Sequence, residues 1–225
     1  MNGGTFTATD VFLGRQNNTA SAVRARANGT FNQSGGTANI TTVTIGDRTS
    51  TTAPTAGANV FGFYNLSGGT LKAQTIQAGG NGANWADVSN TRQFNWSGGT
   101  IQNLSGTNLT MSAGSGLVYT LSGATDKTFN ADNGQSITVN SGLTGSGGNL
   151  VKTGAGTLYL NATNTYTNST MVDVGTLIVG GGGTGSITSN VAVASGATLG
   201  GSGTITGNVT LAAETSSGAK DGGKL

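Results

Sequence analysis

The sequence predicts an all-β solenoid, a chain that winds into successive coils whose strands pair in parallel. The first observation is a repeated phrase of an aromatic residue, Asn, a variable residue and Ser-Gly-Gly-Thr, at 31–37, 64–70 and 94–100. The second is composition, with 41 glycines among 225 residues and only 8% charged residues. Soluble globular domains usually carry about 25% charge. The hydrophobic residues occur in short, regular runs, which is not typical of a disordered chain.

Gly-Gly-Thr triplets divide the first part of the chain at nearly even intervals. They begin at Gly3, Gly35, Gly68 and Gly98, so they recur after 32, 33 and 30 residues. The run after each of the first three triplets ends in glycine, and alternating apolar residues near its end indicate a strand. No helical periodicity appears before residue 140. A period of about 30 residues built from strand and turn is typical of a solenoid, in which each coil buries its inner face against its neighbours.

Each position of the phrase is expected to have a fixed place in the coil. The aromatic residues Phe31, Tyr64 and Phe94 are expected to point inward and to stack on one another. The Asn that follows each of them is expected to face outward or to occupy a corner, because Asn forms local turn bonds. The Gly-Gly pair supplies backbone dihedrals that residues with a Cβ resist. The phrase is therefore predicted to be a corner joined to a rung of the core.

The variable position of the phrase holds Gln33, Leu66 and Trp96, and this diversity favours an outward side chain. Exposed aromatic side chains can stack on sugar rings through their apolar faces. Trp96, at this position, and Trp85, in the polar stretch 79–90, are therefore candidate contacts for surface glycans. The alternative interpretation is that both tryptophans pack ordinarily against loops.

The second part of the chain has a different pattern, in which glycines separate shorter runs such as 158–160, 176–179 and 191–193. One stretch combines leucines, a lysine and glycines in a fixed order: Leu150, Lys152, Gly154, Gly156, Thr157, Leu158, Leu160, Asn164, Thr165, Tyr166, Thr167, Thr170, Val172, Gly175, Thr176, Leu177 and Val179. In order and spacing, residues 143–211 resemble the autotransporter-associated β-strand repeat, also called the passenger-associated transport repeat. That family usually has two glycines where this chain has Asn168 and Ser169, which are still expected to form a turn.

The resemblance implies a right-handed parallel β-helix on the extracellular side or outer surface of a bacterium. It further implies a structural or adhesive stalk element of an autotransporter-like passenger, without catalytic residues. We expect a single elongated β-helix over 1–213, with phrase-type coils at 1–140 and passenger-repeat coils at 141–213, and a flexible tail at 214–225. A β-helix has open backbone groups at each end. We therefore expect either continuation into a longer passenger or end-to-end self-association into filaments.

Composition argues against several kinds of chemistry. Histidine and cysteine are absent, so the sequence offers neither a Ser-His-Asp arrangement nor thiolate or imidazole ligands for a metal, and no cofactor is expected. A glycosidase needs two carboxyl groups roughly 5–10 Å apart. The eight acidic residues are scattered, and the nearest pair is Asp126 and Asp132. We therefore expect a protein that is not an enzyme.

Charge and hydropathy bear on two further kinds of partner, nucleic acids and membranes. The formal net charge is +2 and no cluster of Lys or Arg exists, so no nucleic-acid partner is expected. No run approaches the roughly 18 apolar residues of a membrane span, so no membrane insertion by this segment is expected. Two alternative functions stay open at this point. One is a carbohydrate-binding module, and the other is the non-catalytic part of a polysaccharide-processing β-helix enzyme.

Overall fold

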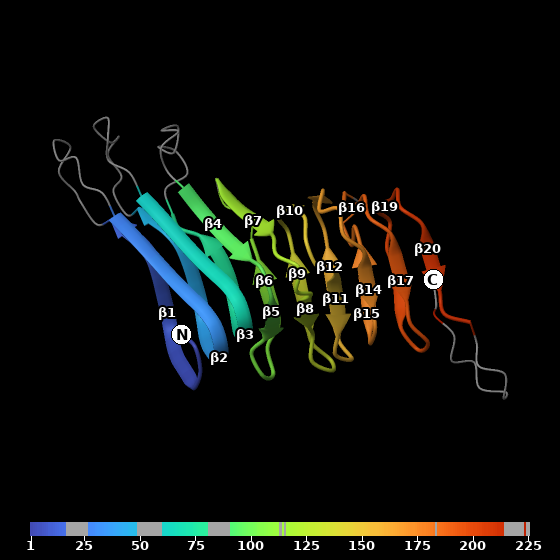
Figure 1. Ribbon diagram of the computed structural model, residues 1–225, viewed down its shortest axis with the longest axis horizontal. Helices are drawn as coiled ribbons and strands as arrows, with labels where there is room; N and C mark the ends of the chain where they lie inside the picture. Colours follow the sequence, from blue (N-terminus) through green and yellow to red (C-terminus); the bar gives the residue numbers. More distant parts are fainter. Residues whose placement is uncertain are drawn as a thin grey trace.

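The computed structural model describes residues 1–16, 27–48, 60–80, 91–112, 114, 116–182, 184–213 and 223. Strand accounts for 63% of this part of the chain, which contains no helix and so no helix that could cross a membrane. The strands pair in parallel within a strongly curled sheet, which confirms the predicted parallel β-helix. Figure 1 shows the strands following one another along the long axis, from β1 to β20.

Long strands open the fold and shorter ones follow. The long strands are β1 (Thr5–Gln16), β2 (Ala27–Arg48) and β3 (Val60–Ala78). The shorter strands are β4 (Thr91–Trp96), β5 (Gly99–Asn103), β6 (Leu109–Met111), β7 (Leu117–Leu121), β8 (Lys127–Asn130), β9 (Ser136–Val139), β10 (Leu143–Gly145), β11 (Leu150–Thr153), β12 (Thr157–Leu160), β13 (Thr163–Asn164), β14 (Thr170–Val172), β15 (Thr176–Val179), β16 (Ser186–Ile187), β17 (Val191–Val193), β18 (Thr198–Gly200), β19 (Thr204–Ile205) and β20 (Val209–Leu211).

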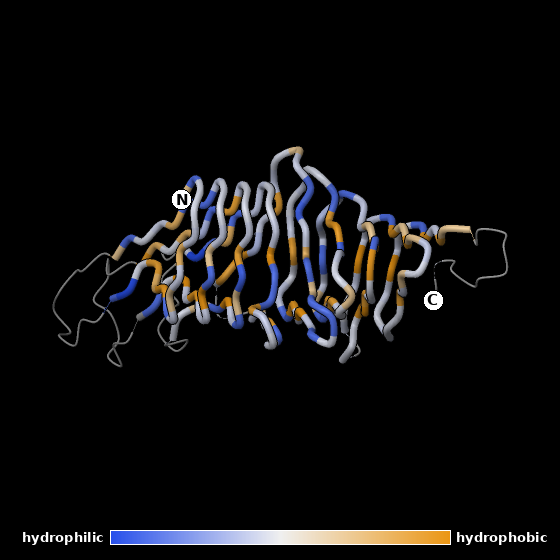
Figure 2. Tube along the Cα trace, turned by 90° about the horizontal axis from the view of Figure 1, so that it is seen from below, coloured by the Kyte–Doolittle hydropathy of each residue, from blue (hydrophilic) through white to orange (hydrophobic). Residues whose placement is uncertain are grey.

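Successive coils stack in register, apart from a local irregularity at Ser34 where β2 pairs with β3. One column of paired residues passes through nine rungs: Thr5, Thr37, Thr70, Thr100, Thr128, Val151, Met171, Ala192 and Thr210. Neighbouring strands lie about 4.8 Å apart, so this column is roughly 38 Å long. Figure 2 shows the same coils from a perpendicular direction, side by side along the long axis.

The coils become shorter along the chain. Asn32 and Asn65 occupy equivalent places 33 residues apart, whereas Asn190 and Asn208, near the other end, are 18 residues apart. The early coils therefore match the period of about 30 residues seen in the sequence, and the later coils are shorter. The long early coils contain strands that bend at Gly-Gly pairs, and the later coils are built from separate short strands.

Glycine is required at the bends of the early coils for two reasons. Gly36 and Gly69 have φ angles of 67° and 75°, in the left-handed region that residues with a Cβ avoid. A Cβ on Gly69 would also lie 2.4 Å from the carbonyl oxygen of Gly36 in the preceding coil. The Gly-Gly pair thus turns the corner and permits close stacking of the coils, as the sequence predicted.

Apolar side chains fill the interior as continuous ladders. One ladder runs through Val11, Val43, Ile76, Met111, Val139, Leu160 and Val179. The predicted aromatic stack is also present, because the ring centroids of Phe31 and Tyr64, and of Tyr64 and Phe94, are 5.1 Å apart. Tyr64 and Phe94 are fully buried and Phe31 is half-buried. Tyr119 extends the stack, with its ring 5.7 Å from that of Phe94.

The outward placement expected for the variable position of the phrase is wrong. Gln33 and Leu66 have no exposed surface, and Trp96 is 1% exposed. The physical reason is the two-residue period of a strand, which places residues i and i+2 on the same face. The variable residue follows the inward aromatic by two positions, so it must also point inward.

The side chains at this position differ because each meets a different neighbour. Gln33 accepts a hydrogen bond from the Tyr64 hydroxyl at 2.6 Å and donates one to the Thr70 carbonyl at 3.0 Å. Trp96 places its indole edge-on against Phe129, at 4.8 Å between ring centroids, and donates to the Gly99 carbonyl at 3.3 Å. Variability here reflects a core whose composition changes from coil to coil.

The Asn of the phrase faces outward and forms a ladder of amide hydrogen bonds. Asn65 donates to Asn32 at 2.7 Å, and Asn95 donates to Asn65 at 2.8 Å. We expect Asn65→Ala to lower the free energy of unfolding by about 1 kcal/mol, because it removes two bonds at a partly solvated position. Chemical denaturation measures this change. Asn39→Ala, at another outward position of β2, is the control, and an equal loss there would contradict a specific role for the ladder.

Candidate functional site

The coil that begins at β11 carries the motif singled out in the sequence. It comprises β11, β12 and β13, and the next coil begins at β14, where Thr170 pairs with Leu150. The apolar positions of the motif all point into the core: Leu150, Leu158, Leu160, Val172, Leu177 and Val179. Any interaction of this coil beyond apolar packing therefore depends on the polar residues of the motif.

Lys152 occupies an inward place and has no exposed surface. It lies in the column between Phe129 and Val172. Its Nζ donates to the carbonyls of Thr153 and Gly154 at 2.7 Å each and to that of Val174 at 3.0 Å. An ammonium group has three donors, so all three are used. Burial lowers the pKa of Lys152 to about 8. The side chain thus joins the corner after β11 to the corresponding corner of the next coil.

Asn164 joins three successive coils from the end of β13. Its side-chain oxygen accepts a hydrogen bond from the backbone N–H of Leu143 at 3.1 Å, in the preceding coil. Its side-chain nitrogen donates to the carbonyls of Ala162 at 2.8 Å and of Ser186 at 3.0 Å, the latter in the following coil. A buried amide with these partners is well satisfied, which is the condition for burying it at low cost.

Tyr166 and Asn168 complete the turn toward β14. The Tyr166 hydroxyl lies 2.6 Å from Thr170 Oγ1, and burial raises the pKa of Tyr166 to about 12. Asn168 accepts a hydrogen bond from the Gly147 N–H at 2.6 Å, in the preceding coil. The chain bends at Asn168, so Asn168 and Ser169 replace the usual glycine pair without loss of the turn, as expected.

Tyr166→Phe is expected to lower the free energy of unfolding by about 1 kcal/mol at pH 7, through loss of the bond to Thr170. The difference should shrink toward zero near pH 11. In the wild type the unfolded tyrosine ionises from about pH 10, while the folded one stays neutral up to about pH 12. The wild type therefore loses stability above pH 10, and phenylalanine cannot. Urea denaturation at both pH values tests this, and a difference that widens at pH 11 would contradict it.

Glycine sets the spacing of these coils at their corners. Gly154 and Gly175 have φ angles of 75° and 77°. A Cβ on Gly175 would lie 2.4 Å from the Gly154 carbonyl oxygen and 2.9 Å from Lys152 Nζ. The glycine therefore leaves the room in which the lysine reaches its acceptors.

The family model of the passenger-associated transport repeat matches residues 150–179. This match confirms the expected resemblance over these residues. The repeat suggests an autotransporter passenger region, and its family implies a secreted or surface-exposed bacterial protein. No curated protein and no solved structure matches the chain.

The two tryptophans expected to contact glycans have different outcomes. Trp96 is enclosed by the core, so its ring is not available to a ligand at the surface, and that expectation is wrong. Trp85 lies outside the residues that the structure describes, and its role stays a prediction.

The acidic residues nearest in sequence are separated by a strand. Asp126 precedes β8 and Asp132 follows it, and six residues of extended chain span roughly 15–20 Å. Asp126 accepts a hydrogen bond from the Asn149 N–H at 2.7 Å, and Asp132 accepts one from the Gln102 amide at 2.8 Å. Both carboxylates hold loops between neighbouring coils. Within the described ranges, no group of three His, Cys, Asp or Glu side chains is placed to hold a metal ion.

Lys152, Asn164 and Tyr166 stand out in the sequence as motif residues, but the motif alone does not indicate their physical roles. Their alternation with exposed threonines was a usable signal. In Thr163–Thr167 every second residue is Asn or Tyr and is buried, while the threonines between them are exposed. A two-residue period therefore places Asn164 and Tyr166 inside the coil.

Proposed function

We propose that this chain is a structural stalk segment of the extracellular passenger of a bacterial autotransporter-like protein, and that it is not an enzyme. The observation that carries the proposal is that the motif's buried polar residues form hydrogen bonds between coils. Lys152 donates one of its three hydrogen bonds to the next coil, and Asn164 is hydrogen-bonded to both the preceding and the following coil, so the motif contributes to coil stacking. A match to the passenger-associated transport repeat over the same residues supports the proposal.

The architecture suits a stalk because coils can be added without changing their neighbours. In a solenoid each coil contacts only the adjacent ones, and stability is approximately a sum over coils and interfaces. The change in coil length disfavours end-to-end filaments of identical copies. Coils of 33 and 18 residues cannot align all of their strand columns.

Deletions that preserve register test the proposal. The chain is placed between a fluorescent reporter and an outer-membrane translocation barrel, and the reporter at the cell surface is quantified. Deletion of 150–169 removes one coil and joins Asn149 to Thr170, which takes the place of Leu150. Deletion of 37–69 is the matched control, because Thr70 takes the place of Thr37.

We expect both deletions to leave a folded solenoid, and the loss of 150–169 to lower surface display several-fold more than the control. This result is expected because the deleted coil belongs to the family of repeats associated with transport of passengers. Equal display by both variants would contradict a specific role for the repeat. Cleavage of a polysaccharide by the purified full chain would contradict a purely structural function.

A further inference from the structure

A groove of about 420 Å³ crosses the outer face of three successive coils. Its lining consists of the side chains of Asn108, Gln135, Ser136, Thr157 and Tyr159 and the turn residues Gly134, Ala155 and Gly156. None of these residues is charged. The groove lies entirely within described residues, and its lining does not include Lys152, Asn164 or Tyr166.

The groove is built on aligned outward positions. Thr157 pairs with Ser136, and the pairing of Leu109 with Ile137 places Asn108 beside Ser136 in the coil before. These three side chains therefore form a row along the axis, with about 4.8 Å between rungs. Tyr159 follows Thr157 by two residues and faces the same side. The turns at Gly134 and Gly156 form the adjoining wall.

The polar side chains of this groove are free for a ligand. Asn108 uses its side-chain oxygen to accept from the Ser136 N–H at 2.9 Å, which orients the amide. The Asn108 amide nitrogen, the Gln135 amide and the hydroxyls of Ser136, Thr157 and Tyr159 make no hydrogen bond to any residue in the described part of the chain. The outward amides of Asn32 and Asn65, in contrast, are hydrogen-bonded to each other in a ladder.

The Tyr159 ring is held in place by the neighbouring coil. A Cβ on Gly181 would lie 2.9 Å from Cδ1 of Tyr159, so the backbone after β15 packs directly against the ring. The Gly181 N–H donates to the Asn161 side chain at 3.0 Å, which fixes this turn. A ring positioned in this way loses little side-chain entropy when a ligand stacks on it.

We propose that this groove binds a neutral oligosaccharide. Sugars present both apolar C–H faces and many hydroxyls, and the groove offers one aromatic face beside amides and hydroxyls. The absence of charged lining residues favours a neutral sugar over an anionic one. The carboxylate of the adjoining turn, Asp132, is already hydrogen-bonded to the Gln102 and Asn103 amides. This activity goes beyond the stalk function and does not depend on it.

Amide NMR shifts of the purified full chain test the proposal. The probes are neutral hexasaccharides of glucose, mannose, galactose, xylose and N-acetylglucosamine, with polygalacturonate as the anionic comparison. We expect at least one neutral probe to give saturable shifts centred on 134–136 and 155–159. Tyr159→Ala and Gln135→Ala should each weaken that binding about tenfold or more, equivalent to about 1.4 kcal/mol.

Ile178→Ala is the matched control, because Ile178 pairs with Tyr159 on the next rung and lies outside the groove. Its affinity for the same probe should equal that of the wild type, and circular dichroism confirms that all three variants fold. The proposal is overturned if no neutral probe shifts these amides at about 10 mM, well above a millimolar Kd. It is equally overturned if polygalacturonate alone binds, or if both groove variants bind as the wild type does.

Discussion

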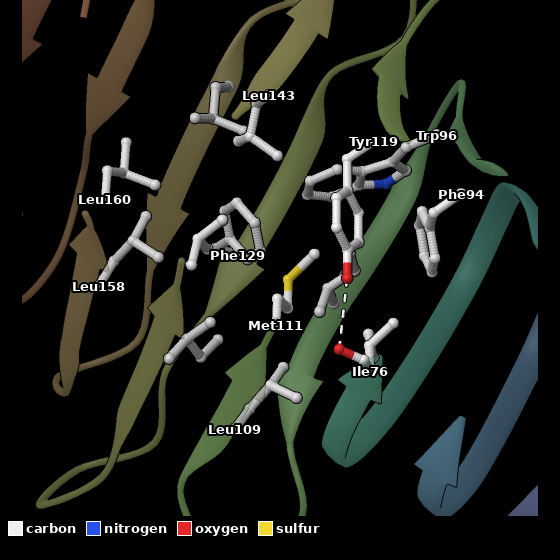
Figure 3. Close-up of a cluster of buried hydrophobic side chains, with 14 of the residues drawn as sticks. Ile76, Phe94, Trp96, Leu109, Met111, Tyr119, Phe129, Leu143, Leu158 and Leu160 are labelled. Carbon is white, nitrogen blue, oxygen red and sulfur yellow. Dashed lines mark hydrogen bonds between the residues drawn. The ribbon is translucent and has the colours of Figure 1, made fainter. Parts of the chain in front are cut away.

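Trp96→Ala is expected to lower the free energy of unfolding by about 3–5 kcal/mol, as much as Phe94→Ala. Both side chains are buried from the same strand, β4, two positions apart. Truncation of either leaves a cavity that the flanking coils cannot fill, because their backbones are held in register by the parallel ladder. Figure 3 shows Trp96 within the buried cluster that also contains Tyr119 and Phe129.

Chemical denaturation of the two variants gives this comparison directly. The control is Asn95→Ala, which lies between them in β4 and points outward. It should cost only about 1 kcal/mol, through the ladder bond to Asn65. A loss at Trp96 as small as the loss at Asn95, beside a large loss at Phe94, would show that the indole does not support the core.

The solenoid itself could be predicted because its signals are local and repeated. The spacing of the Gly-Gly-Thr triplets gave the coil length, and the pairing of Thr37 with Thr70 confirms that interval. The aromatic stack also followed from the repeat, since equivalent residues of parallel coils lie directly above one another. These features depend only on period and residue type.

The contents of the core could not be read from variability in the same way. Gln33 lies inside because its amide meets the Tyr64 hydroxyl, a partner 31 residues away in the next coil. A strict two-residue count from the inward aromatic would have placed Gln33, Leu66 and Trp96 correctly. Diversity at a position indicates outward placement only where the core is uniform, and this core changes along its axis.

The role of Lys152 was beyond sequence reasoning for a different reason. Lysine is almost never fully buried without partners, so the residue type alone would place Lys152 at the surface. Its acceptors include the Val174 carbonyl, contributed by the next coil. Only the stacked structure brings that atom within reach. The groove beside Tyr159 likewise forms only when the coils stack. The outward direction of the Tyr159 side chain, in contrast, follows from the two-residue period of β12, because Leu158 and Leu160 on either side point inward.

Lys152→Met is expected to lower the free energy of unfolding by about 2–4 kcal/mol at pH 7, because it leaves carbonyl oxygens beside the core without their hydrogen-bond donor. The Thr153 carbonyl keeps a bond from the Ala131 N–H at 3.1 Å. The carbonyls of Gly154 and Val174 lose the ammonium that binds them. Methionine restores most of the apolar volume, so the measured loss reports the polar contacts. Val151→Ala, at the adjacent position of β11, controls for general weakening of the strand and should cost less.

The cost of Lys152→Met should grow as the pH rises from 7 to 9.5. Burial lowers the pKa of Lys152 to about 8 in the folded protein, whereas an unfolded lysine titrates near 10.4. Above about pH 8 the unfolded wild-type chain therefore binds more protons than the folded one, and wild-type stability rises with pH. Methionine cannot titrate, so its variant lacks this rise. Denaturation at pH 7, 8.5 and 9.5 measures the difference below the range in which tyrosines ionise. A cost that stays constant or falls would show that the three carbonyls stabilise the ammonium by more than burial penalises it.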